Sequence, residues 1–290
     1  MQRMFKTVLV LAAALVTWPA TAGEVAPPDG VAGAIQLVDN AAAPAVTHRP
    51  DHKPAGKIVL GLAYSGTPFA FKRDGNPRGF ELDLARAVAE EMGVELEVRW
   101  FPRHELLPAL EAGEVHLVNV GAVQGELPAE VDVVPYLLTG EHVVVHRDNP
   151  FAIHTAEDLS GTMVVATMGG PGEDFAYELR SRVSETGKAP VEIHTMPMAQ
   201  YTPVAVLFIH ASAYFAPTAA VALQVAEPGT PVKVVSGLFK PTGRLGFGLR
   251  TEDAELKLYL RLALAKVVAK GVYGRLLEAY YIPADCSPFR

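Results

Sequence analysis

The side chains of this chain that could do acid–base or metal chemistry are histidines and carboxylates, but their spacing does not form a catalytic group. Seven histidines are spread over expected strands and turns: His104, His116, His142, His146, His154, His194 and His210. A histidine alone on an apolar strand is more often a hydrogen-bonded core residue than a catalyst. No Ser-His-Asp, Cys-His or metal-ligand spacing is visible in the sequence, and we expect no metal and no cofactor.

A glycine-rich turn is the best candidate for binding an anion. The stretch TMGGPGED places Met168, Gly169 and Gly170 before an expected helix that contains Glu173. Backbone N–H groups and the helix dipole favour anions at a helix N-terminus. A tight strand-to-helix connection uses glycines in the same way, so the turn is compatible with either role.

The elements that must position such groups follow an N-terminal targeting segment. In residues 1–22, Arg3 and Lys6 precede an apolar run and small residues, the order of a cleaved secretory signal peptide. Residues 23–56 are rich in Ala, Pro and Val without a helical or strand period, which predicts a flexible leader. The single cysteine, Cys286, cannot form an internal disulfide bond. We expect a soluble protein of the periplasm.

The charge of the chain argues against two classes of partner. Removing the signal peptide takes away two positive charges and no negative ones, so the formal net charge changes from −7 to −9. An acidic chain without basic runs is a poor ligand for nucleic acids or anionic membranes. We therefore expect neither nucleic acid nor an anionic membrane as a partner, and we expect a monomer.

From Lys57 onward, apolar strands alternate with amphipathic helices. The first set predicts strands at 57–64, 94–101 and 115–123, with helices at 80–93 and 106–113. The second set predicts strands at 141–146, 161–170, 190–196, 212–217 and 243–250, with helices at 173–183, 203–208 and 256–281. Repeated β-α-β order predicts an α/β fold of two doubly wound lobes with parallel strands.

Five segments, in this order, resemble the type II periplasmic solute-binding proteins, and in particular the polar amino acid branch, family 3, that serves ABC importers. The segments are TPFAFKRDGNPRGFELDLARAVAEEMGV (67–94), ELLPALEAGEVHLVNVG (105–121), VDVVPYLLTGEHVVV (131–145), TAEDLSGTMVVATMGG (155–170) and GFGLRTEDAELKLYLRLALAKVVAKGVYGRLLEAYY (246–281). Each segment alone is a weak match, whereas the ordered set is specific.

The resemblance implies two lobes joined by two hinge strands, with a solute bound in the cleft between them. Lobe 1 would comprise residues 57–141 plus 246–290, and lobe 2 residues 147–240. Ligands of doubly wound sheets lie outside the carboxyl ends of the strands, so the turns after the strands are expected to line the cleft. The ligand-binding candidates in these turns are Tyr64, Phe69, Phe71, Gly121, Glu126, Met168, Gly169, Gly170, Glu173, Tyr214 and Phe215. The sequence is equally compatible with Phe69 and Phe71 as core residues.

The charged clamp that the resemblance implies is missing from its expected positions. Amino acid binders of this family hold the α-carboxylate with an arginine that follows the strand at 115–121, and hold the ammonium group with an acidic residue after a second-lobe strand. Residues 121–136 contain no Arg, Lys or His, and Ala216 or Pro217 occupies the acidic position. Arg103, Lys72 and Arg78 fit better as solvated surface charges. We therefore expect a ligand that is not a standard α-amino acid.

Three functions remain open on the sequence alone. The first is a periplasmic binding protein that captures a small solute for the permease of an ABC importer. The second is an accessory protein of the same fold that docks on a periplasmic partner such as a quinoprotein alcohol dehydrogenase. The third is a dehydratase-like enzyme, for which Glu126 and Glu173 are the nearby carboxylates. We favour the first and expect no enzymatic activity.

Overall fold

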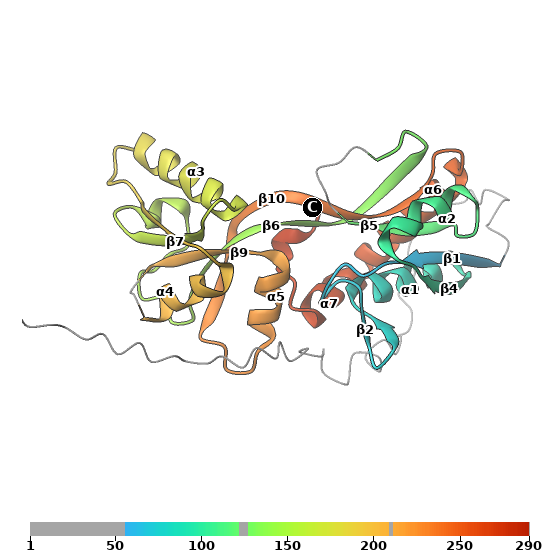
Figure 1. Ribbon diagram of the computed structural model, residues 1–290, viewed down its shortest axis with the longest axis horizontal. Helices are drawn as coiled ribbons and strands as arrows, with labels where there is room; N and C mark the ends of the chain where they lie inside the picture. The colour runs from blue at the N-terminus through green and yellow to red at the C-terminus, as the bar shows by residue number, and fades with distance from the viewer. Residues whose placement is uncertain (1–55, 122–126, 209–210, 290) are drawn as a thin grey trace, which may run out of the picture.

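The structure is a computed structural model that describes residues 56–121, 127–208 and 211–289. Two lobes lie side by side and are joined by long strands (Figure 1). One sheet of eight strands runs through both lobes in the order β4-β1-β5-β10-β6-β9-β7-β8. The predicted signal peptide and almost all of the predicted leader lie outside the described residues. Within the described ranges, no helix is both long enough and apolar enough to span a membrane.

The first lobe contains the beginning and the end of the chain's described part. Its elements are β1 (Lys57–Leu62), β2 (Phe71–Arg73), β3 (Asn76–Arg78), α1 (Phe80–Met92), β4 (Glu95–Trp100), η1 (Arg103–Glu105), α2 (Leu106–Glu111), β5 (Leu117–Val120), α6 (Ala254–Ala269), α7 (Val272–Ala279) and η4 (Ala284–Cys286). β1 pairs in parallel with β4 and β5. Almost every residue of β1 is buried because helices cover both faces of this part of the sheet.

Two glycines determine where the first long helix begins and ends. Gly93 has a φ of 62° and terminates α1 in the left-handed conformation, which confirms the helix stop expected at this residue. Gly79, with a φ of 122°, precedes the helix, and a Cβ atom there would lie 2.0 Å from the carbonyl oxygen of Phe69. The close approach of these two backbones brings the turn after β1 against the start of α1.

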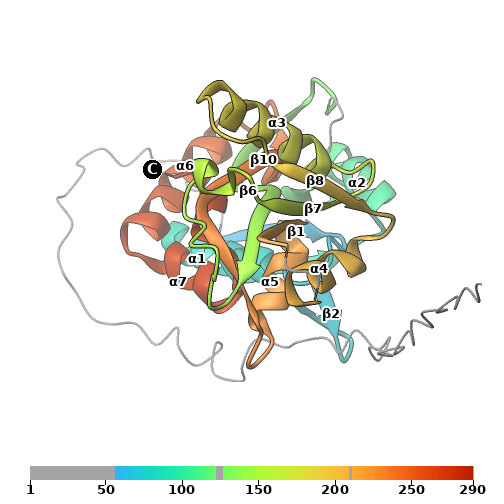
Figure 2. The same cartoon turned by 90° about the vertical axis from the view of Figure 1, so that its left-hand side faces the viewer.

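The second lobe is a shorter stretch of the same sheet with helices on both faces. Its elements are η2 (Ala156–Leu159), β7 (Met163–Thr167), α3 (Pro171–Glu185), β8 (Glu192–Met196), η3 (Ala199–Tyr201), α4 (Thr202–Phe208), β9 (Ala213–Pro217) and α5 (Thr218–Ala226). β7 pairs in parallel with β8 and β9. Figure 2 shows α3 on one face of this sheet and α4 and α5 on the other.

Two long strands, β6 (Val131–His146) and β10 (Val232–Arg250), cross between the lobes and pair antiparallel along most of their length. The sequence predicted strands only at 141–146 and 243–250, because prolines and glycines interrupt the pattern elsewhere. The pairing accommodates them through three register shifts. At one crossing point a Cβ atom on Gly140 would lie 2.0 Å from the carbonyl oxygen of Lys240.

Near the C-terminus, η4 packs on these crossing strands. Cys286 of η4 is fully buried, with its Sγ atom 3.5 Å from His142 Nε2 and 3.7 Å from Thr218 Oγ1. Thr218 is the first residue of α5, a helix that the sequence did not predict because its residues TAAVALQVA have no amphipathic period. His142, Thr218 and Cys286 therefore join β6, lobe 2 and the C-terminus in one buried cluster.

Candidate functional site

The carboxyl ends of the parallel strands are the positions from which a doubly wound sheet presents ligand-binding groups. In lobe 1 these are the ends of β1 and β5. In lobe 2 they are the ends of β7 and β9. We call the side chains and turns at these four strand ends, together with the adjoining part of β6, the strand-end site.

A buried polar network fixes the lobe 1 part of the strand-end site. Asn119 on β5 accepts a hydrogen bond from the Ala63 N–H at 2.7 Å and donates one to the Ala63 carbonyl at 2.9 Å. Its amide also donates to Glu81 at 2.7 Å, and the Ser65 hydroxyl donates to the same carboxylate at 3.0 Å. Burial raises the pKa of Glu81, while these hydrogen bonds oppose the rise. The network ties the turn after β1 to the end of β5.

Arg103 places a cation over the same two strand ends. Its Nη2 atom donates a hydrogen bond to the Tyr64 carbonyl at 3.1 Å. Its Nη1 atom lies 3.1 Å from the position that a Cβ atom on Gly121 would take, so a side chain at residue 121 would crowd the guanidinium group. Arg103 is exposed, as the sequence led us to expect. However, its head group lies at the end of β5, a position that was not predicted from the sequence.

The glycine-rich turn at the start of α3 is part of the strand-end site in lobe 2. The Gly169 N–H donates to the Glu173 carboxylate at 2.6 Å, and the Gly170 N–H donates to the Thr167 carbonyl at 3.1 Å. Residue 171 is a proline and has no N–H group. Among residues 169–172, the amides that were expected to be available to an anion are thus mostly engaged within the turn itself.

Glu141 on β6 is a buried carboxylate beside this turn. The residue is only 7% exposed, and its Oε2 atom lies 3.0 Å from the position that a Cβ atom on Gly172 would take. Burial raises the pKa of Glu141 to about 7. On the neighbouring strand, the residue in register with Glu141 is Pro217, at the carboxyl end of β9. Glu141 therefore belongs to the strand-end site.

The structure separates the predicted ligand-contacting side chains into exposed and buried groups. Tyr64 and Met168 are 63% and 60% exposed, at the ends of β1 and β7. Four predicted aromatic contacts are instead buried in the protein core: Phe69, Phe71, Tyr214 and Phe215. Their burial does not agree with the expectation that they line a solute cleft. Glu126 lies outside the described residues.

Specific contacts account for the burial of these aromatic rings. The Tyr214 hydroxyl donates to Gln224 on α5 at 2.6 Å. The Phe215 ring packs edge-on against Phe175 of α3, with ring centroids 5.5 Å apart. Strand alternation hides both rings because helices cover both faces of lobe 2. The sequence places these residues correctly near a strand end, but it does not show which way their side chains point.

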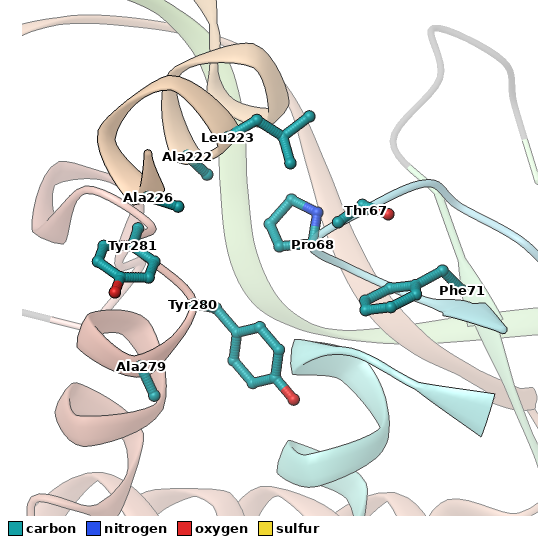
Figure 3. A pocket seen from close by; sticks show the side chains of 9 residues that line it. All are labelled: Thr67, Pro68, Phe71, Ala222, Leu223, Ala226, Ala279, Tyr280 and Tyr281. Carbon is teal, nitrogen blue, oxygen red and sulfur yellow. The ribbon is translucent and has the colours of Figure 1, made fainter. Parts of the chain in front are cut away.

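A small hollow near Phe71 does not offer an alternative solute site. Residues from the turn between β1 and β2, from the start of β2, from α5 and from the end of α7 and the two residues after it surround it (Figure 3): Thr67, Pro68, Phe71, Ala222, Leu223, Ala226, Ala279, Tyr280 and Tyr281. Its volume is about 10 Å³, which is roughly the space of one water molecule. The hollow lies between lobe 1 and α5 and is too small for a solute.

The described residues contain no cluster of His, Cys, Asp and Glu side chains suited to a metal ion. Arg103 and Glu141 are the site residues that reasoning from the sequence missed. Arg103 was assigned to the solvated surface, because its sequence position does not show that its guanidinium reaches the end of β5. Glu141 is predicted from the sequence only as the first residue of a strand, although a charged residue at the start of an apolar strand is an unusual feature.

Comparisons with known proteins agree with this architecture. The sequence profile of the bacterial extracellular solute-binding proteins, family 3, matches residues 58–283. The chain belongs to this family. The resemblance inferred from the sequence is thereby confirmed, and the family binds small-molecule solutes and works with the permeases of ABC transporters.

Individual relatives cover this chain to different extents. The probable amino-acid-binding protein YxeM of Bacillus subtilis is 25% identical over 77% of this chain and 83% of its own length. The arginine-binding extracellular protein ArtP of the same organism is 31% identical over 42% of this chain, and that alignment spans 48% of ArtP, about half its length. The unliganded open form of the L-cystine solute receptor of Neisseria gonorrhoeae superposes with a TM-score of 0.62 at 20% identity, covering 81% of this chain and 95% of the receptor. This last match confirms the predicted α/β fold of the type II binding proteins.

Proposed function

We propose that this chain is a periplasmic binding protein that captures a small solute between its two lobes and delivers it to the permease of an ABC importer. Family membership and the two-lobe fold support this proposal. The observation that carries it is the position of Arg103, a cation held at the ends of β1 and β5. Among the described residues, its guanidinium donates one hydrogen bond, to the Tyr64 carbonyl, which leaves further N–H groups for a ligand.

Arg103 is suited to anchor an acidic group of the solute. A guanidinium group presents several N–H donors in a planar fork that matches a carboxylate, and it stays charged at all physiological pH values. Gly121 leaves room for this fork beside the end of β5. The arginine comes from the turn after β4, whereas residues 121–136 contain no basic residue at all.

This arginine changes the inference about the ligand. Standard α-amino acids were not expected, because the clamp implied by the resemblance is missing from residues 121–136. Arg103 supplies a carboxylate partner from a different turn, so we propose an acidic solute and include amino acids among the candidates. The names of YxeM and ArtP, an amino-acid-binding and an arginine-binding protein, support their inclusion.

A thermal-shift panel tests the proposal. The mature chain is unfolded and refolded to remove carried-over solute, then tested with the standard L-amino acids, L-cystine, succinate, glutarate and putrescine. A ligand at a hundred times its dissociation constant adds about 2.7 kcal/mol, which corresponds to a shift of about 5 °C or more for a chain of this size. A shift with an acidic solute is expected. If no compound of the panel raises the midpoint of thermal unfolding, the result would contradict solute capture. It would then favour the accessory protein that docks on a dehydrogenase.

The Arg103→Gln variant tests the anchor itself. Hydrogen bonds to charged groups contribute about 1.5–3 kcal/mol, so the variant should bind the acidic solute at least about tenfold more weakly. The matched control is Arg86→Gln, which removes an exposed arginine that pairs with Asp83 on α1. Calorimetric titration of both variants measures the difference, and equal affinity in Arg103→Gln and the wild type would refute the assignment of Arg103.

A further inference from the structure

Helix α6 of lobe 1 carries apolar residues on both its inner and its outer face. The helix packs on α1, α7 and β6, and Leu260, Leu264 and Val267 are buried on this inner side. Figure 2 shows α6 and α7 at the left-hand edge of the molecule, with α1 further inside. The opposite face of α6 is therefore an outer surface of lobe 1.

Four exposed apolar residues line the outer face of α6. Leu258 and Leu262 are each 49% exposed, and Ala265 and Ala269 are also exposed. Residues three or four positions apart lie on one face of a helix, so these four form a continuous row, which we call the α6 stripe. A surface helix normally carries polar residues on its outer face, whereas a helix that is apolar all round is normally covered.

The outer face of α3 shows the usual pattern for comparison. It carries the exposed charged residues Asp174, Glu178 and Arg182, with Tyr177 as a single exposed aromatic residue among them. Single exposed apolar side chains are common on protein surfaces and need no partner. The α6 stripe differs because its apolar residues follow one another along the helix without a charged residue between them.

Two unpaired charges lie along one border of the α6 stripe. Glu255 is in the first turn of α6 and Lys266 is in the last turn, and both are exposed. Eleven residues correspond to about three helical turns, so the two side chains lie on the same side of the stripe. Among the described residues, neither side chain takes part in an ion pair or a hydrogen bond. Arg261 lies on the other border and is exposed to solvent.

We propose that the α6 stripe is the contact surface between two copies of this chain, which pair through antiparallel α6 helices. A two-fold axis near residue 260 sets Leu258 of one copy against Leu262 of the second copy. The same arrangement brings Glu255 beside Lys266 of the second copy. A two-fold axis repeats each contact, so four leucines form the centre and one ion pair closes each end. Antiparallel helix dipoles also attract each other.

The size of the α6 stripe predicts a weak dimer. The helix has 16 residues and is about 24 Å long. One helix face of this length buries less than the roughly 800 Å² per partner of a standard stable interface. The dimer should therefore dissociate on dilution, and the monomer expected from the sequence would be the dilute state. The inference does not depend on the proposed function, because no solute takes part in the contact.

Sedimentation equilibrium of the mature chain tests the inference between about 10 µM and about 1 mM, the range in which small interfaces associate. A salt concentration of about 0.15 M limits the repulsion between two acidic copies. The variants are Leu262→Glu, Glu255→Lys and Lys266→Glu. Tyr177→Glu is the matched control, because Tyr177 on α3 is also 49% exposed and gains the same charge. Thermal unfolding verifies that each variant folds.

The wild type is expected to form dimers in this range, and Leu262→Glu should weaken the association at least about tenfold. Tyr177→Glu should behave like the wild type. Glu255→Lys and Lys266→Glu should each associate more weakly alone, because like charges then face each other. An equimolar mixture of these two variants should associate more tightly than either variant alone, because both ion pairs form again with reversed charges.

Three results would overturn the inference. The first is a wild type that stays monomeric at every concentration, which would assign the α6 stripe to a different occupant. The second is a dimer that Leu262→Glu leaves unchanged, because the contact would then lie elsewhere. The third is a mixture of Glu255→Lys and Lys266→Glu that associates no better than the single variants. This last comparison also decides the question if Leu262→Glu fails to fold.

Discussion

Glu141 and His142 are adjacent residues on a crossing strand, and burial shifts their pKa values in opposite directions. Their side chains point to opposite faces of the sheet, as alternate residues of a strand do. The His142 ring stacks on Phe239 with centroids 4.5 Å apart, and its Nε2 atom lies 3.1 Å from Thr218 Oγ1. Burial lowers the pKa of His142 to about 4 and raises the pKa of Glu141 to about 7. Each shift makes stability depend on pH.

The two dependences have opposite signs. The folded state prefers neutral His142, so the free energy of unfolding should fall by about 3 kcal/mol as the pH drops from about 6.5, where the unfolded histidine titrates, to 4. The folded state also prefers protonated Glu141, so the free energy of unfolding should fall by about 3 kcal/mol as the pH rises from about 4.5 to 7. In the wild type, the two changes in the free energy of unfolding largely cancel between about pH 4.5 and 6.5, where both groups contribute.

Single variants separate the two contributions. Urea unfolding is measured between about pH 4.5 and 7 for the wild type, His142→Gln and Glu141→Gln. His142→Gln should lose stability as the pH rises, because only the Glu141 dependence remains. Glu141→Gln should lose stability as the pH falls, because only the His142 dependence remains. His194→Gln, at an exposed position, serves as the control. If His142→Gln shows the same pH slope as the wild type, burial does not disfavour the charged form of His142 and the reasoning is refuted.

Two further variants test the framework that holds the strand-end site. Asn119→Leu should lower the free energy of unfolding by about 3 kcal/mol or more, because the Ala63 backbone groups and Glu81 lose buried hydrogen bonds. Urea unfolding measures the loss, and a change under about 1 kcal/mol would contradict it. Gly79→Ala should lower the thermal midpoint by several degrees, because its Cβ would lie 2.0 Å from the Phe69 carbonyl oxygen at a φ of 122°. An unchanged midpoint would show that the turn relaxes freely.

The strand and helix pattern of each lobe could be predicted from the sequence because local periodicity reports local structure. The apolar run at 57–62 and the helix that ends at Gly93 are examples. The full lengths of β6 and β10 could not be predicted in this way. Prolines and glycines interrupt their patterns, and their continuity comes from pairing with each other over a large sequence separation.

The residues of the site were harder to predict from the sequence than the fold. Tyr64 and Met168 were expected at strand ends and are exposed there. Phe215 was expected to face a solute and is buried, because which face of a strand a helix covers depends on packing. Arg103 and Glu141 were not recognised, because their significance depends on neighbours from distant segments, namely Gly121 for Arg103 and Gly172 for Glu141.

The amino-acid sequence by itself determined the class of this protein: the order of its motifs identified the family, and the periodicity of its apolar residues predicted an α/β fold. It also showed that residues 121–136 contain no basic side chain. Only the tertiary structure showed that a cation from the turn after β4 and an unpaired carboxylate from β6 lie at the strand ends. The physical reason is that the electrostatic environment and the burial of a side chain depend on all residues around it in the folded protein. The order of residues along the chain does not show which residues those are.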